Sequence, residues 1–146
     1  MKRIFRTVCI ILVLTMVLST TAFAAETVAP RASNYFGSSS VYFWHVSGSQ
    51  YQIWFDVTAV TGMSELGTSQ IIVERSTDLV NWSEDATYYK SSSPQMTTQN
   101  TSVRYANYVT YYPTSGYAYR AIVTLYAKNS SGYGEMDVVT EILDLR

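Results

Sequence analysis

The sequence predicts an all-β protein: an antiparallel β-sandwich of about seven strands, preceded by a cleavable signal peptide. Three observations favour this fold class. First, Tyr, Thr, Val and Ile dominate after residue 24, where all 13 tyrosines and all 3 tryptophans lie, and such stiff or flat side chains suit a pleated sheet. Second, turn-forming residues recur roughly every ten residues. Third, this part of the chain shows no convincing helical period. A small closed barrel is the alternative architecture.

Residues 1–24 are expected to be the signal peptide. Lys2, Arg3 and Arg6 give a positive start, Val8–Leu18 is an uncharged apolar run, and Ala22-Phe23-Ala24 has the small-x-small pattern of a cleavage site. These are the three regions of a secretory signal in their usual order. The apolar run is shorter than the roughly 20 residues that a permanent helical anchor needs. We therefore expect cleavage after Ala24 and a secreted, extracellular product.

Cleavage would change both the cysteine content and the charge. The single cysteine, Cys9, lies inside the apolar run, so the product would carry no disulfide and no lipid-bearing cysteine. Three of the ten basic residues and none of the eleven acidic residues would leave, giving a product of net charge −4. A mildly acidic chain without a basic cluster is a poor candidate for nucleic acid or for anionic membranes. We expect no membrane association after cleavage.

Residues 25–40 are expected to form a flexible lead-in, and residues 41–146 a single domain. Val41–Val46 and Gln50–Ala59 read as two strands of a hairpin around Ser47-Gly48-Ser49. The second of these is the clearest strand of the chain. Its alternation places one set of side chains inward, namely Ile53, Phe55, Val57 and Ala59, and the other set outward, namely Trp54, Asp56 and Thr58.

The remaining strands follow after further turn signals. Thr61–Gly67 could hold one helical turn, and Ser91–Gln99 is expected to be a polar loop around Pro94. The other five strands are expected at 70–76, 82–90, 102–112, 117–128 and 135–145. Their alternation points several side chains inward: Ile71, Val73, Val103, Tyr105, Val109, Tyr119, Ala121, Val123 and Leu125. This spacing of short strands is typical of a sandwich that is Ig-like in the broad sense.

Two resemblances accompany this pattern. Tyr117-x-Tyr119-Arg120-x-x-Val123, followed by Asn129-x-x-Gly132, resembles the penultimate strand and next turn of fibronectin type III domains. That resemblance implies that a tyrosine bonds the backbone at a corner. The chain also looks like a family of short, uncharacterised secreted proteins of Gram-positive bacteria. The motifs that carry this second resemblance are Pro30-Arg31-Ala32-Ser33, Trp54-Phe55-Asp56-Val57-Thr58, Ile71-x-Val73-x-x-Ser76-x-Asp78 and Tyr119-Arg120-Ala121-x-Val123-Thr124. It implies no known activity.

Catalytic and metal-binding patterns are weak. Ser76–Trp82 (STDLVNW) resembles a hairpin motif of propeller glycoside hydrolases and sialidase-type repeats, and is expected to be a structural hairpin, with a sugar-contacting turn as the alternative. His45 is the single histidine and cannot build a metal site alone. An Asp56–Glu74 dyad on neighbouring strands and a calcium site at Asp78, Glu84 and Asp85 are conceivable. We expect no catalytic residue, no metal and no cofactor.

The outward aromatic residues are the better candidates for function. If the alternation holds, Trp54, Tyr108 and Tyr126 point away from the core; a strand bulge would reverse that assignment. Exposed aromatic rings offer large contact area at low entropic cost to sugar rings or partner proteins. The sequence therefore favours a secreted, non-enzymatic interaction or carbohydrate-binding module for an extracellular glycan or protein. A small secreted glycoside hydrolase or a bacteriocin-like toxin is the alternative.

Overall fold

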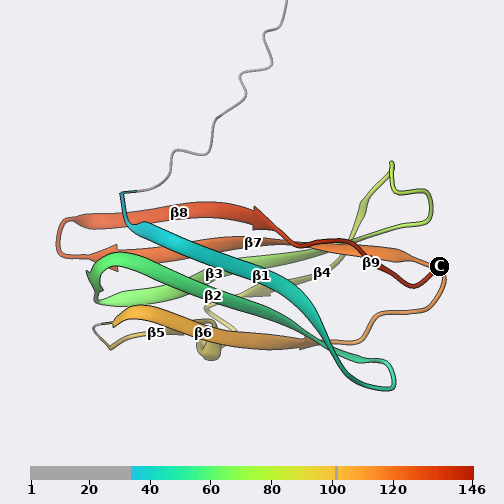
Figure 1. Ribbon diagram of the computed structural model, residues 1–146, viewed down its shortest axis with the longest axis horizontal. Coiled ribbons are helices and arrows are strands. Elements are labelled where there is room, and N and C mark those ends of the chain that lie inside the picture. The colour runs from blue at the N-terminus through green and yellow to red at the C-terminus, as the bar shows by residue number, and fades with distance from the viewer. Residues whose placement is uncertain (1–33, 101) are drawn as a thin grey trace, which may run out of the picture.

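The computed structural model describes residues 34–100 and 102–146. The predicted signal peptide, residues 1–24, and most of the predicted lead-in lie outside these residues. The described elements follow in chain order (Figure 1): β1 (Phe36–Ser47), β2 (Gln50–Met63), β3 (Glu65–Ser76), β4 (Ser83–Tyr89), the short 3₁₀-helix η1 (Pro94–Met96), β5 (Thr97–Thr98), β6 (Ser102–Tyr111), β7 (Ala118–Asn129), β8 (Gly132–Val139) and β9 (Leu143–Asp144).

The strands form two antiparallel sheets. One sheet has the order β1-β2-β6, and the other has the order β4-β3-β7-β8, with β5 paired to β3 and β9 paired to β7. All the strand pairs are antiparallel. The prediction of an all-β, antiparallel protein is confirmed. In the described residues the strands divide between two sheets instead of closing into one barrel.

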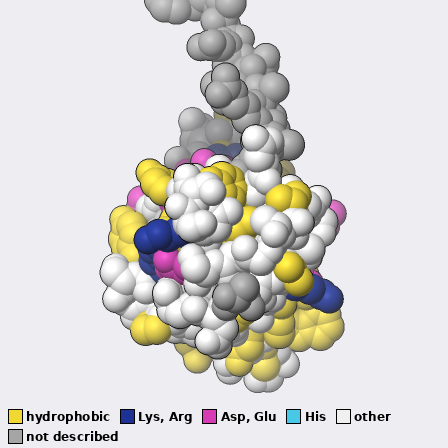
Figure 2. All heavy atoms as spheres, turned by 90° about the vertical axis from the view of Figure 1, so that its left-hand side faces the viewer, with side chains coloured by type: hydrophobic (Ala, Val, Ile, Leu, Met, Phe, Trp, Pro, Cys, Tyr) yellow, Lys and Arg dark blue, Asp and Glu magenta, His cyan; other side chains and the backbone are white. Residues whose placement is uncertain are grey.

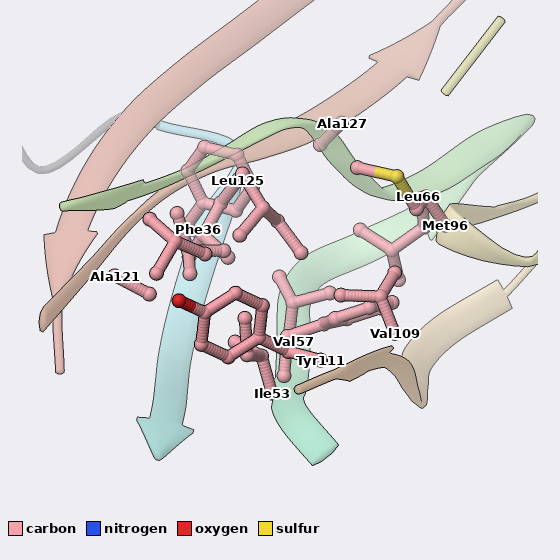
Figure 3. Close-up of a cluster of buried hydrophobic side chains, with 14 of the residues drawn as sticks. Phe36, Ile53, Val57, Leu66, Met96, Val109, Tyr111, Ala121, Leu125 and Ala127 are labelled. Atoms are coloured by element: carbon pink, nitrogen blue, oxygen red, sulfur yellow. The ribbon is translucent and has the colours of Figure 1, made fainter. Parts of the chain in front are cut away.

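One hydrophobic core draws on both sheets (Figure 3). The inward side chains of β2 that the sequence predicted, Ile53, Phe55, Val57 and Ala59, are all buried. They belong to the same cluster as Ile71 and Val73 of β3 and Tyr119, Ala121, Val123 and Leu125 of β7. Burial of such apolar side chains contributes roughly 1.5–3 kcal/mol each relative to exposure. Period-two alternation on strands far apart in the sequence therefore builds a shared core.

Two strands begin earlier than predicted. β1 starts at Phe36, so residues 36–40 are part of a strand and not of the lead-in 25–40. Phe36 is buried, and the serines after it pair with Asp56–Thr58 of β2 across a register shift. The second strand is β3, which was expected to begin at residue 70 but begins at Glu65, where it pairs with Lys128 of β7. Because β2 also runs to Met63, the helical turn predicted in Thr61–Gly67 is wrong.

Three further details differ from the sequence prediction. The polar loop 91–99 contains Met96, which is fully buried beneath it. Val103 is exposed instead of inward, because the β2–β6 register shifts between Thr58 and Met63, so Val103 lies outside the regular ladder. The single last strand expected at 135–145 is divided into β8 and β9, which pair with opposite ends of β7. At the break, Thr140 accepts a hydrogen bond from the Ala121 amide through its Oγ1 (2.9 Å).

Candidate functional site: the outer face of the three-stranded sheet

The outward side of the sheet β1-β2-β6 carries four cross-strand rows of side chains. We call it the outer face and define it by these rows. From one end to the other they are Trp44, Gln52 and Thr110; Tyr42, Trp54 and Tyr108; Ser40, Asp56 and Ala106; and Ser38, Thr58 and Arg104. The rows follow from β2, whose odd-numbered side chains from Ile53 to Ala59 fill the core, so the even-numbered side chains between and beside them must point outward. Residues from 38 to 110 are gathered on one surface.

The second row is a continuous line of aromatic rings. The Trp54 ring centroid lies 4.9 Å from that of Tyr108 and 6.5 Å from that of Tyr42, and the Tyr42 and Trp54 rings are parallel to within 5°. Trp54 and Tyr108 are half-buried, while Tyr42 is 41% exposed and Trp44, in the row beside it, is 58% exposed. The structure thus places Trp54 and Tyr108 side by side on the outward side of the sheet. The sequence had predicted that both side chains face outward.

The Trp54 ring is held in place by its neighbours. Its indole Nε1–H donates a hydrogen bond to Oε1 of Gln52 at 2.9 Å, which lies in the adjacent row on the same strand. Cross-strand aromatic pairs contribute roughly 0.2–1 kcal/mol each to a sheet. A ring fixed on both sides loses little rotamer freedom when a ligand covers it. The row is therefore a preorganised aromatic surface, in which the Tyr108 ring is inclined by 41° to the Trp54 ring and exposed Trp44 lies in the next row.

The other two rows form a polar hollow. Its volume is about 340 Å³, and it is lined by Ser38, Ser39, Ser40, Asp56, Thr58 and Arg104. Arg104 forms a bidentate ion pair with Asp56, in which its Nε lies 3.0 Å from Asp56 Oδ1 and its Nη2 contacts Oδ2. The hydrogen bond from Arg104, aided by its positive charge, lowers the pKa of the Asp56 carboxyl. Asp56 is accordingly an ionised acceptor and not a proton donor at neutral pH.

The third aromatic candidate, Tyr126, is in a different place. It points away from the core, as predicted, but from the outer side of the other sheet, and it is only 8% exposed. The Lys90 ammonium lies 3.4 Å from its ring centroid, and the Tyr133 ring stacks beside it at 6.0 Å. Lys90 is held there by Glu65, at 3.1 Å. The expectation of an open aromatic surface at Tyr126 is therefore wrong, because neighbouring side chains cover it.

The Ser76–Trp82 turn satisfies its own polar groups. Asp78 Oδ1 accepts hydrogen bonds from the amides of Val80 (2.9 Å) and Asn81 (2.8 Å), and Ser76 Oγ accepts one from the amide of Leu79 (2.9 Å). The bonds that Asp78 itself accepts, led by that from the Asn81 amide, lower the pKa of its carboxyl group well below its usual range. The Trp82 ring lies under the Arg120 guanidinium, 4.4 Å away. The turn has the internal bonding of a structural hairpin.

The other catalytic candidates are separated. Asp56 and Glu74 belong to different sheets, and each is paired with its own arginine, Arg104 or Arg120, so the dyad considered from the sequence does not form. His45 is exposed, and its Nε2 lies 3.0 Å from the Gly48 carbonyl oxygen in the β1–β2 turn.

Two wider properties of the described residues bear on the site. Within residues 34–100 and 102–146, no three His, Cys, Asp or Glu side chains gather in a group that could hold a metal ion. In the same residues, no helix has the length and apolar character needed to cross a membrane. Seen end-on, the molecule shows few charged side chains, and hydrophobic side chains gather at the lower right of the view (Figure 2).

Comparison with known proteins adds no family. No protein-family model and no curated protein matches the chain significantly. Among solved structures, the chain is similar to the sporulation control protein Spo0M from Bacillus subtilis, with 10% sequence identity and a TM-score of 0.37, over 72% of this chain and 50% of that one. The chain thus matches about half of that protein's length, and a similarity this low supports no argument about fold or function.

Sequence reasoning missed several residues of the outer face, namely Tyr42, Trp44, Ser38, Ser40 and Arg104. The segment Val41–Val46 is apolar or aromatic at nearly every position, so its alternation does not show which side chains point outward. The β1–β2 turn carries the missing signal. Counting back from a three-residue turn at Ser47-Gly48-Ser49 pairs Trp44 with Gln52 and Tyr42 with Trp54, as the structure has them.

Proposed function

We propose that this protein is an extracellular, non-enzymatic binding module that recognises glycans through the outer face of the sheet β1-β2-β6. The observation that carries the proposal is the ring row Tyr42–Trp54–Tyr108, fixed by ring contacts and by the Trp54–Gln52 hydrogen bond. Sugar rings have apolar C–H faces and polar edges. An aromatic platform next to hydroxyl, carboxylate and guanidinium groups offers a partner to both.

The proposed fold is an Ig-like β-sandwich. If the seven main strands are given the letters A, B, C, C′, E, F and G in chain order, the sheets read A-B-E and C′-C-F-G. The buried Tyr119, near the start of β7, donates a hydrogen bond from its hydroxyl to the Thr114 carbonyl (2.8 Å) and accepts one from the Thr114 amide (2.9 Å). That contact supports the tyrosine corner implied by the fibronectin type III resemblance.

The proposed location is outside the cell. It rests on the order of charged, apolar and small residues in 1–24, which is that of a secretory signal. The absence of cysteine after residue 24 fits a domain that depends on its core and not on disulfides. Glycans are abundant where such a protein would be released, and the outer face is suited to them.

A binding role is favoured over hydrolysis by how the carboxylates are used. Glycoside hydrolysis needs two carboxyl groups across a cleft, one of them protonated at neutral pH. Asp56, Glu74, Asp85 and Glu65 each pair with a lysine or arginine, at distances of up to 3.1 Å. For Asp56, the hydrogen bond from Arg104 lowers the pKa of the carboxyl group and so works against a general-acid role.

A glycan-array screen tests the proposal. The purified chain is compared with Trp54→Ala and with Tyr133→Ala, a control that removes an exposed aromatic ring from the outer side of the other sheet. We expect the wild type and Tyr133→Ala to bind the same glycans. We expect Trp54→Ala to lose at least about 2 kcal/mol of binding free energy, as is typical for a central aromatic contact. No glycan bound by the wild type, or binding that survives Trp54→Ala in a folded variant, would refute the proposal.

A further inference from the structure

The polar hollow lies next to the aromatic row along the direction of β2. Successive outward residues of one antiparallel strand are about 6.8 Å apart. The row of Asp56 is therefore one step from the row of Trp54, and the row of Thr58 and Arg104 is two steps away. From the Trp44 row to the Arg104 row, the outer face is about 20 Å long. A ligand that follows the strands meets aromatic rings first and hydrogen-bonding groups next.

The hollow exists because small side chains surround the ion pair. On either side of Asp56 lie Ser40 of β1 and Ala106 of β6, so the surface falls away beside the carboxylate. Arg104 crosses the floor from the next row to reach Asp56, and its side chain is 67% exposed. Two of its five N–H donors engage Asp56, which leaves three outside that pair.

The groups in the hollow suit hydroxyl groups of a ligand. The hydroxyls of Ser38, Ser40 and Thr58 can each donate and accept hydrogen bonds. Asp56 accepts and Arg104 donates, and both do so more strongly because they are charged. Bonds of this kind to a bound sugar would replace bonds to water, so they give selectivity for the hydroxyl pattern as well as affinity.

The charge of the outer face selects among ligand classes. Asp56 and Arg104 are the charged residues of the four rows, and they neutralise one another. A face without net charge provides no net long-range attraction for a phosphate, a uronic acid chain or a basic peptide. It is instead complementary to an uncharged ligand with many hydroxyl groups.

From this arrangement we infer that the ligand is a segment of a neutral, linear polysaccharide that lies along β2. One sugar unit packs against the Trp54 ring beside Tyr108, and a following unit hydrogen-bonds in the Asp56–Arg104 hollow. This inference rests on the proposed function and adds to it the class of glycan, its direction and a second subsite. It requires that affinity depend on chain length, because a single sugar unit cannot occupy both places.

Affinity electrophoresis tests the ligand class. The purified chain is run in native gels that contain hydroxyethyl cellulose, xylan, mixed-linkage β-glucan or mannan, with polygalacturonate as the anionic probe. We expect retardation by at least one neutral polymer and none by polygalacturonate. Stronger retardation by polygalacturonate would overturn the inference. If none of the neutral polymers retards the protein, the inference is overturned. If, in addition, the protein binds no glycan on the array, the proposed function is overturned as well.

Titration calorimetry with oligosaccharides of one to six units, cut from the retarding polymer, tests the second subsite. We expect affinity to rise at least tenfold with length and then level off. Arg104→Gln should remove most of the gain in affinity with length, and Trp54→Ala should weaken binding at every length. The control Lys128→Gln, which removes an exposed charge from β7, should change neither the affinity nor its dependence on length. Binding that depends on Trp54 but not on chain length or Arg104 would leave the proposed function standing and overturn this inference.

Discussion

Replacing Tyr119 with phenylalanine isolates the contribution of one hydroxyl group to the fold. The Tyr119 ring is fully buried in the core and makes an edge-to-face contact with the Tyr111 ring at a centroid distance of 5.7 Å. The hydroxyl is both donor to the Thr114 carbonyl and acceptor from the Thr114 amide. These bonds close the six-residue connection between β6 and β7, residues 112–117. Phenylalanine keeps the ring and removes both bonds.

The size of the effect follows from the surroundings. A hydrogen bond between neutral groups contributes roughly 0.5–1.5 kcal/mol net, so two contribute about 1–3 kcal/mol. Thr114 is exposed, and water can rehydrate its amide and carbonyl in the variant, which argues against the upper end. We therefore expect Tyr119→Phe to lower the free energy of unfolding by about 1.5–2 kcal/mol.

Urea unfolding followed by tryptophan fluorescence measures this change. With a slope of about 2 kcal/mol per molar urea, the midpoint should fall by roughly 0.75–1 M with the slope unchanged. Tyr133→Phe, which removes a hydroxyl from an exposed ring, should stay within about 0.5 kcal/mol of the wild type. A Tyr119→Phe variant as stable as Tyr133→Phe would show that the Tyr119–Thr114 hydrogen bonds do not stabilise the connection between β6 and β7.

Three other changes give distinct outcomes. The buried Thr68 hydroxyl has no hydrogen-bond partner in the described residues, so Thr68→Val should raise the free energy of unfolding by about 1 kcal/mol in the same urea assay. A Cβ on Gly67 would overlap the Met96 carbonyl oxygen, and a Cβ on Gly48 meets nothing within 4 Å, so Gly67→Ala should be far less stable in thermal unfolding than Gly48→Ala. Burial and the hydrogen bond to Asp85 raise the pKa of Tyr111. As pH rises, the Tyr111 hydroxyl therefore loses its proton in the unfolded chain before it does so in the folded protein. The free energy of unfolding should fall as pH rises above about 10. In urea midpoints measured between pH 9 and 11.5, Tyr111→Phe should show a smaller fall than the wild type. Equal slopes for the wild type and Tyr111→Phe, equal melting of the two glycine variants, or a destabilised Thr68→Val would contradict these expectations.

The strands predicted correctly are those whose own side chains alternate. From Gln52 to Ala59 in β2, half-buried side chains alternate with buried ones, and the buried ones are the predicted Ile53, Phe55, Val57 and Ala59. Burial alternates in the same way over Tyr119–Leu125 in β7. One buried face imposes this period on a strand, so the register can be read without knowing the partner strand.

The features that sequence reasoning missed depend on residues far away in the chain. The serines of β1 look like a linker, but pairing with Asp56–Thr58 makes them part of a strand. Met96 is buried because η1 packs against the core from a polar loop. Tyr126 was assigned to the correct side of its strand, yet Lys90 and Tyr133 cover it. None of these contacts leaves a local pattern in the sequence.

The indole N–H signals of the three tryptophans test the central claim most directly. Trp54 and Trp44 lie on the outer face, while Trp82 lies in the β3–β4 turn of the other sheet, with its Nε1–H donating to the Leu79 carbonyl oxygen at 3.2 Å. In ¹H–¹⁵N correlation spectra recorded during titration with a neutral oligosaccharide that binds, we expect the Trp54 indole signal to shift progressively and the Trp82 signal to stay in place. A titration that moves the Trp82 signal and leaves the Trp54 signal unchanged would contradict binding at the outer face.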